Sequence, residues 1–215
     1  MEGTALKGRL CNPSTATTVG EGADGSTLTD GSYMFYSSGL TSWTVDMQNL
    51  TSGDHMFSNC YSLTSFAGDL SSLTNGNYMF SGCYGMTSFS GDLSSLTSGN
   101  WMFYSCNLTS FTGDLPNLTN GSDMFYDCRA LTSFNSTLPK LESGQEMFVA
   151  CKLDATSVLN ILNSIPTYTS GIHKLHLGNR KNYLDSTDVA ELLGTTTPIA
   201  GKNYSYKGWS ITVTA

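Results

Sequence analysis

Apolar and polar positions recur at one period along most of this 215-residue chain. The stretch Leu63–Phe80 reads LTSFAGDLSSLTNGNYMF, and close copies of it stand before and after. Met-Phe pairs mark the period, and their methionines are 22, 23, 23, 22 and 23 residues apart: Met34, Met56, Met79, Met102, Met124 and Met147. One copy is too short to bury its own apolar side. A fixed period of this length therefore predicts a repeat solenoid whose stacked turns share one core.

Each repeat predicts two short extended pieces joined by turns. The first piece is LTSF or a close variant, and we expect its leucine and its aromatic residue to face inward around a bend. A Gly-Asp-Leu turn follows in several repeats, and a Met-Phe segment expected to be a short helical or 3₁₀ turn closes each repeat. The pattern thus predicts a mainly β solenoid with short helical turns. We expect a positive φ at the glycine that ends the second piece: Gly53, Gly76, Gly99, Gly121 and Gly144.

Phenylalanine and cysteine hold fixed positions in these repeats. Each cysteine follows the repeat phenylalanine by three residues, so both residue types should stack into structural ladders: Phe57, Phe80, Phe103, Phe125 and Phe148, with Cys60, Cys83, Cys106, Cys128 and Cys151. Turns about 4.8 Å apart would permit disulfides, but parallel side chains suit the disulfide torsion poorly. We therefore interpret the cysteines as buried free thiols that act as small apolar residues. The chain has no C-x-x-C pair, so a zinc ribbon is not indicated.

The same pattern divides the chain into three parts. Residues 1–27 are expected to form an irregular N-terminal lead-in or cap, residues 28–153 six repeats, and residues 154–215 a C-terminal capping region. The last part is expected to form an αβαβ cap that closes the final open edge. Its four elements are a helix over 155–165 capped by Asp154, a strand over 172–177, a second helix from Asp185 or Ser186 to Leu193, and a strand over 209–213.

Composition narrows the classes of partner. The formal net charge is −7, which argues against nucleic acid and anionic membranes because both attract basic surfaces. No apolar run approaches the roughly 18 residues of a membrane helix, so no membrane insertion is expected. The opening MEGTALKGRL lacks the apolar segment of a secretion signal, so we expect no signal peptide in this chain. Three explanations stay open: the signal was removed beforehand, export follows another route, or the protein is assembled inside a cell and released later.

One stretch resembles a known family. MTSFSGDLSSLTSGNWMFYSC, Met86–Cys106, is similar to the BspA-like leucine-rich repeat of bacterial surface proteins, most specifically in its Met-Phe-x-x-Cys element. The ending KGWSITV, Lys207–Val213, resembles the C-terminal cap that follows such arrays in gut bacteria and their phages. The resemblance covers roughly Leu28–Leu153. It implies a leucine-rich-repeat right-handed superhelix that serves adhesion or partner binding and has no catalytic role. The first turn departs from the family pattern, with Ser38 in place of the cysteine.

The candidate binding residues lie at positions that vary between repeats. These positions stand just before Met-Phe, just after it, and just after the cysteine, and their variation predicts that they face solvent. Tyrosine and tryptophan on a rigid frame are typical of a recognition surface, for protein or for glycan. The alternative is an ordinary solvent edge with aromatic residues by chance. The candidates are Tyr33, Tyr36, Tyr61, Tyr78, Tyr84, Trp101 and Tyr104.

Three further groups invite a chemical interpretation. An aspartate column, Asp46, Asp69, Asp92 and Asp114, predicts carboxylates that accept backbone N–H bonds in turns, with a calcium ladder as the alternative. A small hydroxyl face follows the strands and is more simply solvated strand than an ice- or sugar-binding flat surface. His173 and His176 lie three apart on a strand and should point to opposite faces, so they make no metal pair.

These observations favour a non-catalytic binding or adhesion module of a bacterial cell-surface protein. No nucleophile, zinc-hydrolase, phosphate-loop or dinucleotide motif occurs, so we expect neither an enzyme nor a cofactor. The expected location is extracellular, on a bacterial surface or on a virion. Two alternatives stay open: a phage or prophage tail-fibre or receptor-binding module, and a structural or filament-forming protein that associates through its solenoid ends.

Overall fold

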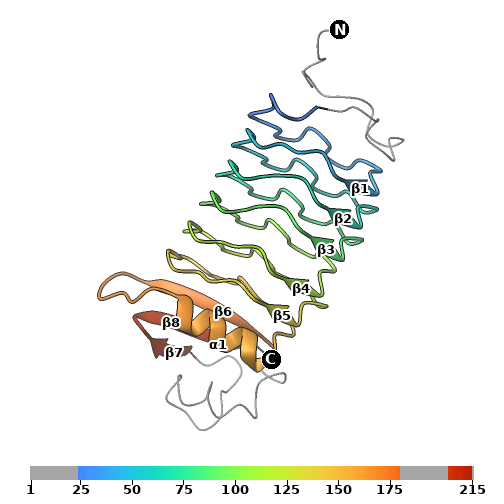
Figure 1. Cartoon of the computed structure of the whole chain (residues 1–215). Coiled ribbons are helices and arrows are strands. Elements are labelled where there is room, and N and C mark those ends of the chain that lie inside the picture. Colours follow the sequence, from blue (N-terminus) through green and yellow to red (C-terminus); the bar gives the residue numbers. More distant parts are fainter. Residues whose placement is uncertain (1–23, 180–202, 215) are drawn as a thin grey trace.

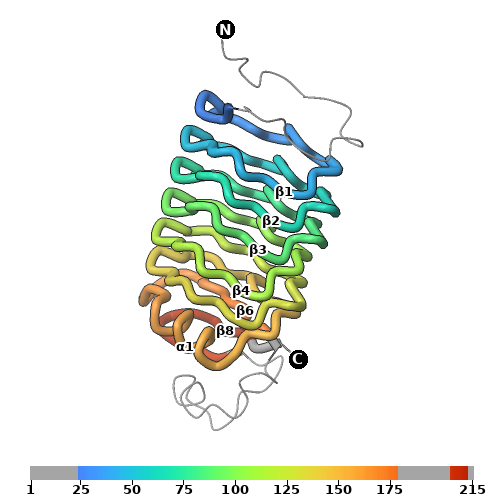
Figure 2. Tube along the Cα trace, turned by 45° about the vertical axis from the view of Figure 1, so that its right-hand side comes forward, coloured from blue at the N-terminus to red at the C-terminus, as the bar shows by residue number. Residues whose placement is uncertain are grey.

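The chain forms a rod of stacked turns. The structure, a computed structural model, describes residues 24–179 and 203–214. Successive turns follow one another from the blue to the yellow end of the rod (Figures 1 and 2). Each of the five turns that carry a strand contributes only two strand residues, and the strands lie along one side of the rod: β1 (Ser42–Trp43), β2 (Ser65–Phe66), β3 (Ser88–Phe89), β4 (Ser110–Phe111) and β5 (Ser133–Phe134).

Backbone hydrogen bonds join neighbouring turns on two sides. On the strand side, amides of the later turn donate to carbonyls of the earlier one, as from Thr64 to Thr41 at 2.8 Å. On the Met-Phe side the direction reverses, and alternate amides donate to the following turn, as from His55 to Asn77 at 3.0 Å. Both sides thereby satisfy backbone groups that would otherwise be costly to bury.

The Met-Phe segment is a series of β-turns. In the second repeat, three i+3→i hydrogen bonds run in succession, from Met56 to Gly53, from Ser58 to His55 and from Cys60 to Phe57. The residue before the methionine and the residue before the cysteine both have left-handed φ values, 54° at His55 and 61° at Asn59. Two left-handed residues per segment cannot belong to a right-handed helix, so the expected short helical turn is wrong.

The expected positive φ at the glycines that end the second piece is also wrong. Among the described glycines only Gly82, Gly171 and Gly208 have positive φ. Four of the predicted glycines, Gly53, Gly76, Gly99 and Gly121, make room for the methionine of the next turn, and Gly144 makes room for Leu175. A Cβ on Gly53 would lie 2.9 Å from Met79 Sδ, which is closer than real Cβ atoms approach. Glycine is thus needed here for space and not for backbone freedom.

Two aromatic columns fill the core. Rings of the Met-Phe column stack on one another with centroids 5.3 to 5.6 Å apart, from Phe35 to Phe148. The strand aromatics form a second column, which meets the first edge-on, as Phe66 meets Phe80 with centroids 4.9 Å apart. Stacked and edge-on pairs of this kind each add about 0.5–1.5 kcal/mol to the gain from area burial.

The repeat cysteines are free, buried thiols that also act as hydrogen-bond donors. Each Sγ donates to the carbonyl of a phenylalanine in the preceding turn, at 3.0 to 3.2 Å. Burial raises the pKa of the Cys128 thiol to about 12, so the sulfur stays protonated and able to donate. The interpretation of these residues as purely apolar was therefore incomplete.

The strand-side ladder is interrupted once. β1, β2 and β3 form one parallel sheet and β4 and β5 another, with no pairing between β3 and β4. The rings of Phe89 and Phe111, which face each other across this break, have centroids 6.1 Å apart. On the Met-Phe side the ladder continues past the same level, as from Tyr78 to Asn100 at 2.9 Å.

A helix and a small sheet follow the last turn. The predicted helix is α1 (Ala155–Ser164), and the Asp154 carboxylate accepts a hydrogen bond from the Ser157 amide at 2.8 Å. The two predicted strands are present, and the structure adds a third that the sequence did not suggest: β6 (His173–Asn179), β7 (Asn203–Tyr206) and β8 (Trp209–Thr214), in sheet order β6-β8-β7. The predicted second helix, like residues 1–23 of the predicted lead-in, lies outside the described residues.

These elements pair with backbone groups of the last turn. The Ser157 hydroxyl accepts from the Phe134 amide at 2.9 Å, and the Gly144 amide donates to the Lys174 carbonyl of β6 at 2.9 Å. His176 Nδ1 accepts from the Glu146 amide at 2.5 Å. Burial, opposed by the Glu146 charge, lowers the pKa of His176 and favours the neutral form that this bond requires.

The space requirement at the glycines can be tested with a double-mutant cycle. A Cβ on Gly76 would lie 3.1 Å from Met102 Sδ, so Gly76→Ala should cost about 1–3 kcal/mol by overpacking. If space is the cause, Met102→Ala should absorb most of that cost, with a coupling energy of at least about 1 kcal/mol in urea unfolding. Additive losses would mean that the glycine serves another purpose.

The hydrogen bonds of the cysteine thiols predict that a serine variant is more stable than an alanine variant. Cys106 Sγ donates to the Phe80 carbonyl at 3.2 Å. Cys106→Ala loses that bond and leaves a small cavity, so it should cost about 1–2 kcal/mol. Cys106→Ser keeps a donor and should cost less, as Ser38 fills the same position in the first turn. Thermal unfolding of both variants checks the order, and a serine variant no more stable than the alanine variant would contradict it.

Candidate functional site

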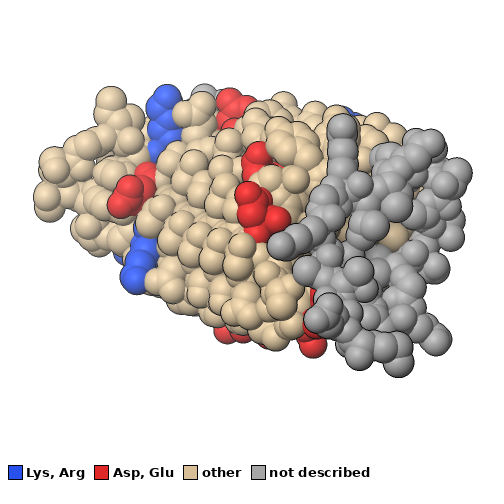
Figure 3. Space-filling view, turned by 90° about the horizontal axis from the view of Figure 1, so that it is seen from above, with Lys and Arg blue, Asp and Glu red and all other residues tan. Residues whose placement is uncertain are grey.

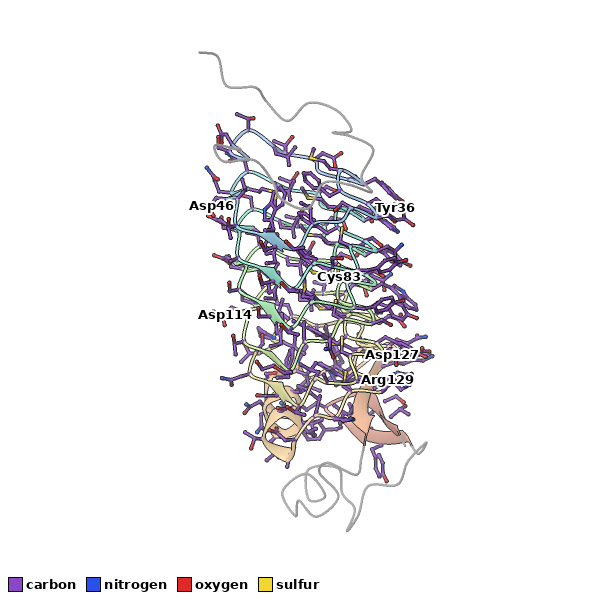
Figure 4. All side chains as sticks on the ribbon, turned by 90° about the vertical axis from the view of Figure 1, so that its right-hand side faces the viewer. Tyr36, Asp46, Cys83, Asp114, Asp127 and Arg129 are labelled. Carbon is purple, nitrogen blue, oxygen red and sulfur yellow. The ribbon has the colours of Figure 1, made fainter. Side chains whose placement is uncertain are left out.

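The candidate binding residues lie along the Met-Phe side of the rod. Figure 4 shows Tyr36, Asp127 and Arg129 on this side, Asp46 and Asp114 on the opposite side, and Cys83 between them. We use the name aromatic edge for the aromatic residues just before and just after the Met-Phe pairs: Tyr33, Tyr36, His55, Tyr78, Trp101, Tyr104 and Tyr126.

The rings before the methionines form a continuous stack. Tyr33 and His55 have centroids 4.6 Å apart, His55 and Tyr78 4.4 Å, and Tyr78 and Trp101 6.0 Å, with interplanar angles of 14° or less. Trp101 continues the stack to Tyr126 at 5.8 Å. Because inner rings have a neighbour on each face, Tyr78 and Trp101 are only partly exposed and present their edges to solvent.

Sequence reasoning missed two members of this stack, His55 and Tyr126. Both occupy the same repeat positions as the named candidates, so position alone would have found them. The stack is a property of the repeat register more than of any one residue type.

Two of the predicted residues form a separate group. Tyr61 and Tyr84 follow their cysteines and stack with centroids 5.4 Å apart and planes 3° apart. Each is 58% exposed, more than any other tyrosine of the described turns. No ring of the aromatic edge contacts either of them among the described residues, so we treat them as a distinct tyrosine pair.

The backbone under the aromatic edge is strained. All six residues before the methionines have φ between 54° and 59°: Tyr33, His55, Tyr78, Trp101, Asp123 and Glu146. Bulky residues rarely adopt this left-handed conformation, which costs about 1–2 kcal/mol relative to right-handed backbone. The second left-handed position in each turn instead carries small or tolerant residues, such as Asn59, Gly82 and Asp127.

The stack gives way to carboxylates towards the C-terminal end of the rod. Asp123 and Glu146 follow Trp101 at the same repeat position. Burial, together with the Glu146 charge, raises the pKa of Asp123 to about 6. Neither carboxylate pairs with a Lys or Arg side chain among the described residues, whereas Asp127 lies 2.6 Å from Arg129 Nε.

The aspartate column on the opposite side has a structural role. Asp69 Oδ1 accepts from the Ser71 amide at 2.7 Å, and Asp92 Oδ1 accepts from the Ser94 amide at 2.8 Å. Asp46 accepts from the amide of Asp69 in the next turn at 3.0 Å. Asp69 and Asp92 thus make the turn bonds that we expected, while Asp46 bonds between turns. Within residues 24–179 and 203–214, no three His, Cys, Asp or Glu side chains are grouped so that they could hold a metal ion.

The remaining candidates do not form a site. The strand hydroxyls Ser42, Ser88 and Ser110 are solvent-exposed. The two histidines of β6 each bond to a residue of the last turn, His173 Nδ1 to the Glu142 carbonyl and His176 Nδ1 to the Glu146 amide. The His173 ring also stacks on Tyr168 with centroids 3.5 Å apart. In the view of Figure 3, acidic and basic residues form small separate groups on a surface that is mostly uncharged.

Comparison with known proteins identifies the repeat. A family model described as the BspA type leucine-rich repeat region matches residues 25–90 and 71–171, with six copies. No curated protein and no solved structure matches the chain. In the part of the chain that the structure describes, no helix is long and apolar enough to cross a membrane.

The raised pKa of Asp123 predicts a pH dependence of stability. The folded chain holds this proton more tightly than the unfolded chain, whose carboxyl titrates near 3.8. Stability should therefore increase as the pH falls through about 6 and should lose this contribution at higher pH. Asp123→Asn should remove this slope between pH 7.5 and 5 and stabilise the protein at pH 7.5 by at most about 1 kcal/mol, since Asp123 is partly solvent-screened.

Urea unfolding at pH 7.5 and pH 5 measures this slope. Asp127→Asn is the matched control, because Asp127 is paired with Arg129 and its loss should bring no gain at pH 7.5. Equal slopes in the wild type and in Asp123→Asn would contradict the prediction.

Proposed function

The chain belongs to the BspA-type leucine-rich repeat family, and on that basis we propose that it is a non-catalytic binding module whose aromatic edge holds a protein partner. Proteins with this repeat are typically surface-associated and generally non-catalytic. The proposed setting is therefore the exterior of a bacterial cell, where the module would act as part of an adhesin.

The observation that carries this proposal is the choice of residues at the strained positions. Glycine would relieve a left-handed backbone at no steric cost, and this chain uses 22 glycines elsewhere. Before the methionines it instead carries tyrosine, histidine, tryptophan and acidic residues. Strain that is kept at solvent-facing side chains supports a role for those side chains in recognition.

Ring geometry supports protein over glycan as the partner of this stack. A sugar ring packs its C–H face on an open aromatic face, but the inner rings of the stack cover one another. What remains available is a row of ring edges, phenol hydroxyls and the indole. These groups suit the mixed apolar and polar contacts of a protein interface, where tyrosine and tryptophan dominate binding energy.

The alternatives have less support. A phage or prophage receptor-binding module would use the same edge, and the KGWSITV ending is the observation in its favour. A filament of end-to-end turns would need free backbone groups at the end of the array. There, the amides of Phe134 and Gly144 already donate to Ser157 and Lys174.

The proposal predicts that substitutions in the aromatic edge weaken binding but change the stability of the fold only a little. Replacing both Tyr78 and Trp101 by glycine removes their stacking, worth about 0.5–1.5 kcal/mol per pair, but relieves two left-handed residues. We expect a change in unfolding free energy of less than about 2 kcal/mol and at least a tenfold loss of binding.

A phage-displayed library of random 12-residue peptides, selected on the immobilised wild type, supplies the probe. Selected peptides should lose binding to the Tyr78→Gly, Trp101→Gly double variant and keep it with Asp114→Ala, which changes the opposite side of the rod (Figure 4). Failure to select any peptide that distinguishes these two variants would count against the aromatic edge as a protein-binding surface.

A further inference from the structure

The break between β3 and β4 leaves backbone groups without their usual partners. Other neighbouring strands are joined by two recurring bonds, such as Thr87 to Thr64 at 3.0 Å and Ser90 to Phe66 at 3.0 Å. The equivalent bonds from Thr109 to Thr87 and from Thr112 to Phe89 are missing. We use the name seam for this break, with Tyr84–Phe89 on one side and Asn107–Thr112 on the other.

The chain is one residue shorter at the seam. Two residues separate the cysteine from the next core residue in the second, third and fifth turns, but Asn107 stands alone between Cys106 and Leu108. In the third turn, hydrogen bonds from the Tyr84 amide to the Gly82 carbonyl and from the Met86 amide to the Cys83 carbonyl make a tight bend. Asn107 and Leu108 make no equivalent hydrogen bonds. The sixth turn is also short, but there the Lys152 amide keeps the ladder by donating to Leu131 at 2.9 Å.

The two sides of the seam carry an exposed aromatic ring and uncharged hydrogen-bonding groups. Tyr84 has one ring partner, Tyr61 in the turn before, and at the same repeat position in the turn after stands the short side chain of Asn107. Tyr84 is 58% exposed, and the Asn107 amide is exposed and makes no hydrogen bond within the described residues. The Thr87 carbonyl and the Thr109 amide add an acceptor and a donor.

We propose that the seam is a binding site for a neutral saccharide, whose pyranose ring stacks on Tyr84. A pyranose presents an apolar C–H face and a rim of hydroxyls that both donate and accept hydrogen bonds. Tyr84 matches the face, while Asn107, Thr87 and Thr109 match the rim. These hydrogen-bonding groups lie on solvent-exposed residues and have no protein partner in the described part of the chain, so sugar hydroxyls that take the place of water there add both affinity and orientation.

The absence of charge at the seam decides the class of saccharide. Tyr84, Thr87, Ser88, Asn107, Thr109 and Ser110 carry no charge. A sulfated or carboxylated sugar would find no cation among these residues, whereas the hydroxyls of a neutral sugar need only hydrogen-bonding partners to replace water. This site lies outside the aromatic edge and does not depend on the protein partner proposed there.

A panel of neutral tetrasaccharides, built from glucose, xylose and N-acetylglucosamine units, tests the proposal by calorimetry and by amide chemical shifts. At least one should bind the wild type and shift the amides of Thr109 and its neighbours. Tyr84→Ala should weaken that binding at least tenfold, while Tyr84→Phe, which keeps the ring face, should change it less than twofold. Asn107→Ala should weaken it by a smaller factor.

An insertion variant tests the role of the seam itself. An alanine placed between Asn107 and Leu108 restores the spacing of Arg129-Ala130-Leu131 and should close the ladder, raise the melting temperature and abolish saccharide binding. Binding unaffected by Tyr84→Ala, or no binding by any member of the panel, would overturn the proposal. The Tyr78→Gly, Trp101→Gly variant should bind the saccharide like the wild type. Because the two sites use different residues, the peptide experiment tests only the protein-binding proposal and the saccharide experiment tests only the proposal for the seam.

Discussion

Backbone hydrogen bonding between successive turns sets the position of every other group in this rod. Because the same atoms bond in each turn, equivalent side chains stand one above another at the spacing of the ladder. That spacing suits flat rings, and both core phenylalanine columns use it. It leaves little room for a Cβ beneath the methionine of the next turn, which accounts for Gly53, Gly76, Gly99 and Gly121. It also brings each thiol within reach of a carbonyl in the turn before. Core composition is therefore a consequence of the ladder.

The period alone was enough to predict the stacked turns, their shared core and the cysteine and phenylalanine columns. It could not give the conformation of single residues, because residue preference and packing can select the same amino acid. Glycine at position 76 is compatible with a positive φ, but Met102 of the next turn is the actual reason for it. The opposite error occurred at Trp101, a residue that never suggests left-handed backbone and yet adopts it. Strand β7 was missed because its pairing with β8 depends on contacts beyond the repeat.

The seam shows a second limit of sequence reasoning. Three turns are short after the cysteine position, at Gly39, Asn107 and Lys152. The first is followed by a paired strand, and the last keeps its ladder through the Lys152 amide. Among the described turns, only at Asn107 does the short spacing coincide with two neighbouring strands, β3 and β4, that do not pair with each other. A length difference in the sequence marks a place where the ladder can fail, and the neighbouring turns decide whether it does.

The same ladder explains how a strained edge can vary freely. In five of the six segments the amide of the left-handed residue before the methionine donates to the next turn, as from Tyr78 to Asn100, from Trp101 to Ser122 and from Asp123 to Gln145. Hydrogen bonds on both sides of the segment hold this backbone whatever side chain it carries. The hydrogen bonds between turns therefore offset the conformational free energy of the left-handed residues. Aromatic, imidazole and acidic side chains can then replace one another at one position without a change of fold. A surface that varies in this way while its frame stays constant is the property that recognition requires, and here it follows from backbone bonds alone.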